Sequence, residues 1–204
     1  MKLNLERCFS DAWSVFARNW LLLMVAGLLF SAVSAVTAFI LAGPMLTGLV
    51  FLSLQALRRE DHVADLSDLF VPFDRFWSTV GLFFLTLSGV LVGLSLCLAP
   101  GLYLMVVWMF PFYILADQRV GIGEALSKGQ QIVWAAGFWN ISLLALTTLV
   151  LELLPHFVPV AGTVVSFATG PFATLVAGAA YLQLTEHSPA AATAEAAEAG
   201  PQPA

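Results

Sequence analysis

Long stretches without charged residues dominate the sequence. Trp20–Leu57 has 38 residues and Phe76–Ala116 has 41, and neither contains Asp, Glu, Lys or Arg. As α-helix, each stretch would rise about 57–61 Å, roughly twice the ~30 Å of a bilayer's hydrocarbon core. Each stretch therefore predicts two membrane crossings.

A third apolar region predicts two more crossings. Its helices are expected at about Phe138–Leu154 and Val160–Leu184, separated by Pro155 and Pro159, with Glu152 as its single acid. Proline favours a separation there because it lacks the N–H that a helix interior needs. The chain thus predicts an all-α, polytopic bundle of about six segments arranged as three hairpins.

Pairs of glycine and proline mark the expected interruptions. The segment after the first pair, 44–57, spans only about 21 Å as helix, and 101–116 is similarly short. Re-entrant hairpins that do not reach the far side are therefore an alternative to full crossings, and both arrangements return the chain to the side it left. The expected break positions are Gly43, Pro44, Pro100, Gly101, Gly170 and Pro171.

An amphipathic stretch precedes each hairpin, beginning near residues 8, 67 and 124. The interval of nearly sixty residues suggests an internal repeat. Helices with one apolar face and aromatic residues at its edge lie in the headgroup plane, so we expect interfacial helices on the cytoplasmic side. The alternative is that these stretches are the ends of membrane helices. In the first stretch the expected apolar face comprises Leu5, Phe9, Ala12, Trp13, Phe16 and Trp20.

The basic residues indicate orientation. All of them fall on one side of the predicted layout, and the three far-side turns contain none. Basic residues are enriched in cytoplasmic loops, so we expect both termini in the cytoplasm. The eight bases are Lys2, Arg7, Arg18, Arg58, Arg59, Arg75, Arg119 and Lys128.

Composition excludes an ordinary soluble domain. The chain of 204 residues is 60% hydrophobic and 10% charged, with a mean hydropathy of +0.90, whereas soluble domains are about 25% charged. The net charge of −5 argues against a nucleic-acid partner, which requires a basic face. Residues 188–204 are rich in Ala, Pro and Glu, so we expect a disordered cytoplasmic tail after a membrane domain of residues 1–187.

One polar pair is a candidate for chemistry. Glu152 and His156 lie four residues apart, and a carboxylate with an imidazole in a membrane can relay protons or bind an ion. Pro155 lies between them near a predicted helix end, which favours a water-exposed interfacial glutamate instead.

The sequence has no hydrolase, zinc-protease or nucleotide-binding motif, so we expect no enzyme activity, cofactor or metal. Gly89 and Gly93 have the spacing for close helix contact, which we expect within the chain.

Several short motifs occur in order along residues 5–184: an amphipathic start with Trp13, Gly43–Gly48, Asp68–Phe70, Pro100-Gly101, and Glu124–Ser127. Together they resemble a group of uncharacterised bacterial six-helix membrane proteins, which are similar to the membrane domain fused to some glycerophosphodiester phosphodiesterases. The resemblance implies a location in the bacterial inner membrane and six helices, and it brings no catalytic residues. The chain lacks the soluble phosphodiesterase barrel, so that activity is not carried over.

The sequence favours a non-enzymatic membrane component that organises lipid or partner proteins. Its expected partners are the bilayer, other membrane proteins or a second copy of the chain. The alternative is a small transporter or channel, because broken helices can bind ions at their ends. A polar cavity in the middle of the membrane would favour this alternative, and an interior filled by Leu, Val and Phe would oppose it.

Overall fold

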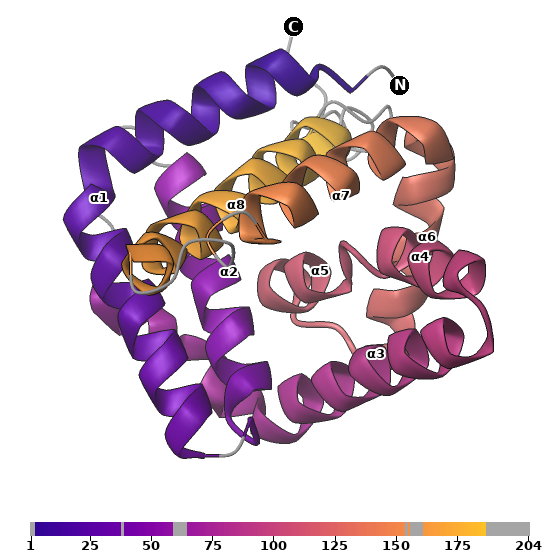
Figure 1. Cartoon of the computed structure of the whole chain (residues 1–204), viewed down its shortest axis with the longest axis horizontal. Helices are drawn as coiled ribbons and strands as arrows, with labels where there is room; N and C mark the ends of the chain where they lie inside the picture. Colours follow the sequence, from indigo (N-terminus) through magenta and orange to yellow (C-terminus); the bar gives the residue numbers. More distant parts are fainter. Residues whose placement is uncertain (1–2, 38, 59–64, 154, 156–160, 187–204) are drawn as a thin grey trace, which may run out of the picture.

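The computed structural model of the chain describes residues 3–37, 39–58, 65–153, 155 and 161–186. These residues form helices joined by short turns, without a strand among them, which confirms the all-α class (Figure 1). The predicted tail, 188–204, lies outside the described residues. The elements are α1 (Leu5–Val36), α2 (Ala42–Arg58), the 3₁₀-helix η1 (Leu66–Arg75), α3 (Phe76–Leu96), α4 (Leu98–Val107), α5 (Pro111–Gln118), α6 (Ile122–Ala136), α7 (Phe138–Leu153) and α8 (Ala161–Glu186).

Several helical stretches are long and apolar enough to cross a membrane. Among the described residues there are four: Leu5–Val36, Leu66–Leu96, Leu98–Gln118 and Val165–Thr185. A fifth forms if α6 and α7, which meet at a bend of 108°, are taken as one broken span. Gly137 allows this bend through a φ of +90°, which side-chain-bearing residues rarely adopt. The chain is therefore a multi-pass membrane protein.

The first two interruptions lie a few residues before the expected Gly and Pro pairs. Phe39, with a φ of 65°, lies between α1 and α2, whereas Gly43-Pro44 falls in the first turn of α2. Cys97 is extended between α3 and α4, and Pro100-Gly101 lies in the first turn of α4. The physical reason is that a first turn has N–H groups without intrahelical partners, so proline costs little there. These pairs mark helix starts and not the turns themselves.

The third pair, Gly170-Pro171, does not interrupt a helix, so the prediction of a break there is wrong. Helix α8 runs continuously through Gly170 and the buried Pro171. Proline removes the hydrogen bond to the carbonyl four residues earlier, that of Phe167, and α1 approaches this carbonyl closely at Gly27. Contact with a neighbouring helix is how membrane helices tolerate an internal proline.

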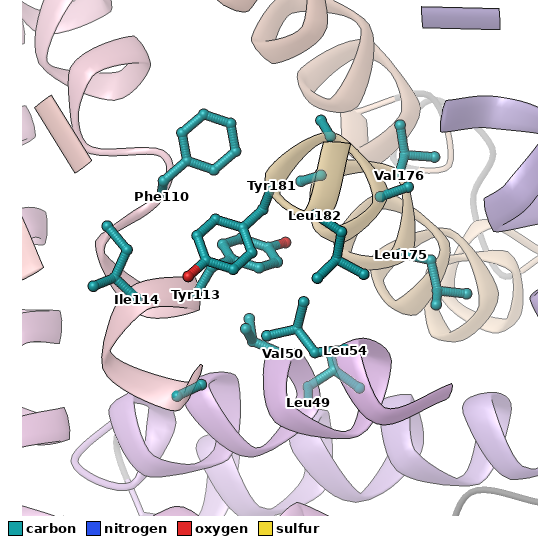
Figure 2. Packing of buried hydrophobic residues seen from close by; sticks show 14 of the residues in the cluster. Leu49, Val50, Leu54, Phe110, Tyr113, Ile114, Leu175, Val176, Tyr181 and Leu182 are labelled. Atoms are coloured by element: carbon teal, nitrogen blue, oxygen red, sulfur yellow. The ribbon is translucent and has the colours of Figure 1, made fainter. Parts of the chain in front are cut away.

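Helix α2 lies at the centre of the bundle. It contacts α1, η1, α3, α5 and α8, and most of its residues are buried. Figure 2 shows its Leu49, Val50 and Leu54 facing Leu175 and Leu182 of α8. A helix of 17 residues rises about 26 Å, so α2 is short for a span and is surrounded mainly by protein.

Helix α1 runs antiparallel along α8. The Asn4 N–H donates to Gln183 Oε1 at 3.4 Å, and the rings of Phe9 and Phe172 lie 6.3 Å apart. Asn19 has non-helical angles (φ −117°, ψ 23°) and kinks α1 between its two halves. The first amphipathic stretch is thus the first half of one long helix that packs on α8.

The apolar face expected for this stretch is only partly correct. The fully buried side chains are the small or medium-sized Cys8, Ala12 and Val15, whereas Trp13 and Trp20 are 63% and 53% exposed. Small side chains let the two helix backbones approach each other, so they face α8. The indole of Trp20 lies on the outside, and that of Trp13 is exposed but packs edge-on against Phe172 of α8, with ring centroids 6.1 Å apart.

The other two amphipathic stretches form separate elements. η1 leads directly into α3, and α6 is separated from α7 by the bend at Gly137. Helix α6 buries Ala125, Gly129 and Val133 on one face, which agrees with an amphipathic helix. The glycine spacing in α3 is used within the chain: a Cβ at Gly93 would lie 3.0 Å from Gly101 Cα of α4.

Two glycines inside helices provide a matched test of this packing. A methyl group at Gly48 would collide with the Leu69 carbonyl oxygen of η1, whereas nothing lies within 4 Å of one at Gly170. We expect Gly48→Ala to lower the free energy of unfolding by about 1–3 kcal/mol, as overpacking does. Gly170→Ala should leave stability unchanged or raise it by up to about 1 kcal/mol through helix propensity. Thermal unfolding in detergent measures both, and equal effects would contradict the packing of η1 on α2.

Candidate functional site

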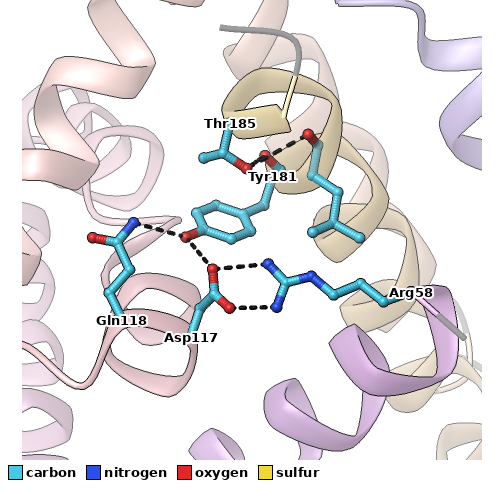
Figure 3. A network of polar contacts seen from close by, with 6 residues as sticks. Arg58, Asp117, Gln118, Tyr181 and Thr185 are labelled. Atoms are coloured by element: carbon cyan, nitrogen blue, oxygen red, sulfur yellow. Dashed lines mark hydrogen bonds and ion pairs between the residues drawn. The ribbon is translucent and has the colours of Figure 1, made fainter. Parts of the chain in front are cut away.

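An ion pair joins the ends of three helices that are distant in sequence. Arg58, at the end of α2, donates from Nη1 to Asp117 Oδ1 at 2.5 Å and from Nη2 to Oδ2 at 3.0 Å. Tyr181 of α8 donates its hydroxyl to Asp117 Oδ2 at 3.0 Å. Figure 3 shows the carboxylate of α5 held between the guanidinium and the phenol. Bidentate pairing of this kind fixes the geometry of both partners.

Further polar contacts extend this network. Gln118 Nε2 donates to the Tyr181 hydroxyl at 3.3 Å, and Lys128 Nζ of α6 donates to Gln118 Oε1 at 2.8 Å. Arg75, at the end of η1, donates to the carbonyl oxygens of Arg119 and Val120. The ends of α2, η1, α5 and α8 therefore meet the start of α6. We call this region the polar end, defined by Arg58, Arg75, Asp117, Gln118, Lys128 and Tyr181.

Sequence reasoning missed the polar end as a site, although one signal pointed to it. Arg58 and Asp117 are the first charged residues after the first and second uncharged stretches. Helices that return to the same side of a membrane bring such residues to one level. The Arg58 and Asp117 side chains are only 35% and 17% exposed, which fits a pair that holds helices together.

A cavity of about 170 Å³ that is open on one side lies among α2, α5, α7 and α8. Most of its lining is apolar, and the polar contributions come from Tyr113, Thr148, Glu152 and Thr174. The other lining residues are Leu46, Val50, Met109, Phe112, Ala173 and Ala177.

Glu152 is exposed, as the sequence predicts, and it also lines this cavity. It lies near the C-terminal end of α7, but it shares the cavity with Val50 and Thr174, which lie well inside α2 and α8. Helix α7 leaves α6 at a steep bend, so its end reaches the middle of its neighbours. His156 lies outside the described residues, and its pairing with Glu152 stays a prediction.

The hydroxyl groups around the cavity donate to backbone carbonyls. Tyr113 donates to Thr174 O at 3.0 Å, and Thr174 Oγ1 donates to Pro171 O at 2.7 Å. Thr148 Oγ1 lies 3.0 Å from Ala145 O and 3.2 Å from Leu144 O. Thr174 Oγ1 also lies 3.1 Å from Ser53 Oγ of α2, and either hydroxyl can be the donor of this hydrogen bond. The hydroxyl groups are therefore engaged with backbone carbonyls and, at Thr174, with a second hydroxyl.

The other predicted positions do not form a site with Glu152. Gly43, Pro44, Pro100 and Gly101 begin helices, as described above, and are absent from the lining of this cavity. Within the described residues, no group of three or more His, Cys, Asp or Glu side chains has a metal-binding arrangement.

Comparisons of the chain with family models, with curated proteins and with solved structures find no match. The resemblance to six-helix bacterial membrane proteins therefore stays a prediction.

The hydroxyl of Tyr181 provides a test of the polar end. We expect Tyr181→Phe to lower the free energy of unfolding by about 1–2 kcal/mol, because a hydrogen bond to a partly buried carboxylate is lost. Tyr103→Phe is the control, since that tyrosine is 38% exposed on α4 and lies away from Asp117. Chemical denaturation in micelles measures both variants, and a Tyr181→Phe protein as stable as the control would contradict the network.

Proposed function

We propose that the chain is an integral protein of the bacterial inner membrane that organises lipid or partner membrane proteins and catalyses no reaction. The observation that carries the proposal is the placement of exposed tryptophans. These lie at the three junctions where an amphipathic stretch meets a long apolar helix, and they are 53% to 83% exposed. They are Trp13, Trp20, Trp77, Trp134 and Trp139.

Each junction has a distinct local form. Trp13 and Trp20 flank the kink at Asn19, and Trp77 is the second residue of α3 after η1. Trp134 and Trp139 flank the bend between α6 and α7. Tryptophan is enriched where the bilayer meets water, so this pattern supports a shared headgroup level at the three junctions. It also supports interfacial positions for η1 and α6.

The polar end supports the hairpin topology. Its contacts join the ends of α2, α5 and α8, and the contact of Asn4 with Gln183 adds the start of α1. Three out-and-back passes, formed by α1 with α2, by α3 with α4 and α5, and by α6 and α7 with α8, account for these meetings. With the positive-inside bias, we infer that the polar end and both termini face the cytoplasm.

The use of hydroxyl groups along the apolar helices supports a structural role for them. Thr86 of α3 donates to Leu82 O at 2.8 Å, and Ser142 and Thr147 of α7 donate to carbonyls four residues earlier. Such back-bonding satisfies a polar group within its own helix, as a lipid environment requires.

A small transporter or channel is the second candidate function. The cavity beside Glu152 favours it, because an ionisable group that lines a space between the helices of a membrane bundle commonly marks a solute or ion path. The apolar residues that make up most of the cavity lining favour the first candidate.

Reconstitution into proteoliposomes separates the two functions. The first predicts ion and small-solute fluxes equal to those of empty liposomes. A selective flux that disappears in Glu152→Gln would overturn it in favour of the transporter.

Brominated lipids test whether the exposed tryptophans lie at the level of the headgroups. Bromines near the headgroup should quench the protein's fluorescence more than bromines at the ends of the acyl chains.

The two native cysteines allow the topology to be tested. Cys97, between α3 and α4, is exposed, and Cys8 is buried. We expect a membrane-impermeant maleimide to label Cys97 in intact spheroplasts. A Ser127→Cys substitution on α6, made together with Cys97→Ser, should react only after the membrane is opened. Labelling of Ser127→Cys before permeabilisation would contradict the proposed orientation.

A further inference from the structure

We propose that Arg75 and Arg119, at the polar end, bind the phosphate of an anionic phospholipid headgroup. Arg75 is the last residue of η1, and Arg119 follows the last residue of α5. Such binding would be one form of the lipid organisation proposed above, on which this inference rests.

Four basic residues gather at the polar end, and two of them have carboxylate partners. Arg58 pairs with Asp117 at 2.5 Å, and Lys128 pairs with Glu124 at 2.9 Å. The positive charges of these two bases are therefore offset within the chain.

Arg75 and Arg119 differ from them, because neither forms an ion pair with a carboxylate among the described residues. Arg75 donates through Nη1 to the carbonyl oxygens of Arg119 and Val120, which holds its guanidinium beside the turn that follows α5. A carbonyl oxygen has only a partial charge, so the positive charge of Arg75 is not neutralised. A guanidinium has five N–H donors, and those that remain can bind a phosphate.

Both arginines line a small recess between α2, η1, α3 and α5. The one acid among the described residues of its lining is the exposed Asp74, so the lining has two positive charges and one negative charge. This balance favours an anionic headgroup over a zwitterionic one, which brings its own cation. The recess has a volume of about 20 Å³, room for one water, so the phosphate would lie at its edge, where Arg119 is exposed.

The backbone of Arg119 indicates independently that its side chain has a use. Arg119 has a φ of 52° and a ψ of 31°, which lie in the left-handed region. Glycine or asparagine is usual at a helix end of this kind, because other side chains make the conformation costly. An arginine at such a position supports a role for its guanidinium.

Exposed aromatic residues near Arg75 favour a lipid over a free phosphate. Trp77 lies two residues after Arg75 and is 82% exposed, and Phe70 of η1 is 48% exposed. Tryptophan is enriched at the level of the headgroups, where the phosphates of phospholipids lie. Basic pockets between membrane helices on the cytoplasmic side bind anionic headgroups. The acyl chains of a lipid held here would lie against the exposed apolar side chains of α3.

Thermal unfolding of the full chain in a neutral detergent tests the proposal, because a ligand that binds only the folded state raises Tm with its concentration. Phosphatidylglycerol is compared with phosphatidylcholine that has the same acyl chains. We expect a saturable rise in Tm with phosphatidylglycerol that exceeds the rise with phosphatidylcholine. The difference should shrink at about 0.5 M salt, which screens exposed charges. Inorganic phosphate at the same concentrations should leave Tm unchanged.

Two substitutions of Arg119 separate lipid binding from stability. We expect Arg119→Gln and Arg119→Gly each to weaken the apparent affinity for phosphatidylglycerol about fivefold, because one base near a membrane surface contributes about that factor. Arg119→Gly should also keep or raise the Tm measured without lipid, since glycine adopts the left-handed conformation readily. Both variants retain the carbonyl oxygen that accepts from Arg75.

Arg75→Gln tests the second base, and Arg7→Gln is the control. We expect Arg75→Gln to weaken the apparent affinity about fivefold or more, and to lower the Tm without lipid because charged hydrogen bonds to two carbonyls are lost. Arg7→Gln removes an exposed base near the start of α1, which does not line the recess, and the response to phosphatidylglycerol should be unchanged.

Three outcomes would overturn the proposal. They are equal responses to phosphatidylglycerol and phosphatidylcholine, an Arg119→Gly protein with the affinity of the wild type, and a response to inorganic phosphate that equals the response to the lipid. The last would identify a free phosphate as the ligand. Each of them leaves the organisation of partner proteins intact, whereas a selective flux in proteoliposomes would overturn the proposed function without changing the affinity for the lipid.

Discussion

The ion pair between Arg58 and Asp117 brings together three parts of the chain that the sequence keeps far apart. It links the ends of α2 and α5, and the hydroxyl of Tyr181 adds the end of α8. Charged groups are expensive in hydrocarbon, so helices that carry charges only at their ends have to place those ends in or near water. Opposite charges at helix ends that lie at the same depth in the membrane then form ion pairs. These ion pairs hold the helix ends together.

The central helix and the cavity follow from this arrangement. Helix α2 is enclosed by its neighbours because its close contact at Gly48 lets η1 lie against it. Helix α7 reaches inward after the bend at Gly137, and its Glu152 arrives beside residues that lie inside α2 and α8. The polar end and the cavity are thus two regions of different kinds. The first is filled by ion pairs and hydrogen bonds between side chains, whereas the second is an open and mostly apolar space that the exposed Glu152 lines.

Much of the fold could be predicted from the sequence, because lipid imposes simple rules on length and charge. The uncharged stretches correctly predicted a membrane protein, and the helices after residue 137 begin and end close to the expected positions. The predictions that were wrong or shifted by a few residues concern features that depend on packing between helices. Proline at Pro44 and Pro100 is compatible with a first turn, and Pro171 is tolerated beside α1, so the residue type alone could not locate the breaks. The exposure of Glu152 agrees with the sequence, but the cavity beside it could not be foreseen, because the direction of α7 depends on the φ of one glycine.

The central claim is that the chain leaves one side of the membrane and returns to it three times, so that its first and last helices meet at the polar end. Cross-linking between Asn4→Cys and Gln183→Cys tests this most directly, in a chain whose native cysteines are replaced by serine. In native membranes, a short thiol cross-linker should join the two positions within one chain, and both should react from the same face of the membrane. If the two cysteines instead react only from opposite faces, the account is wrong.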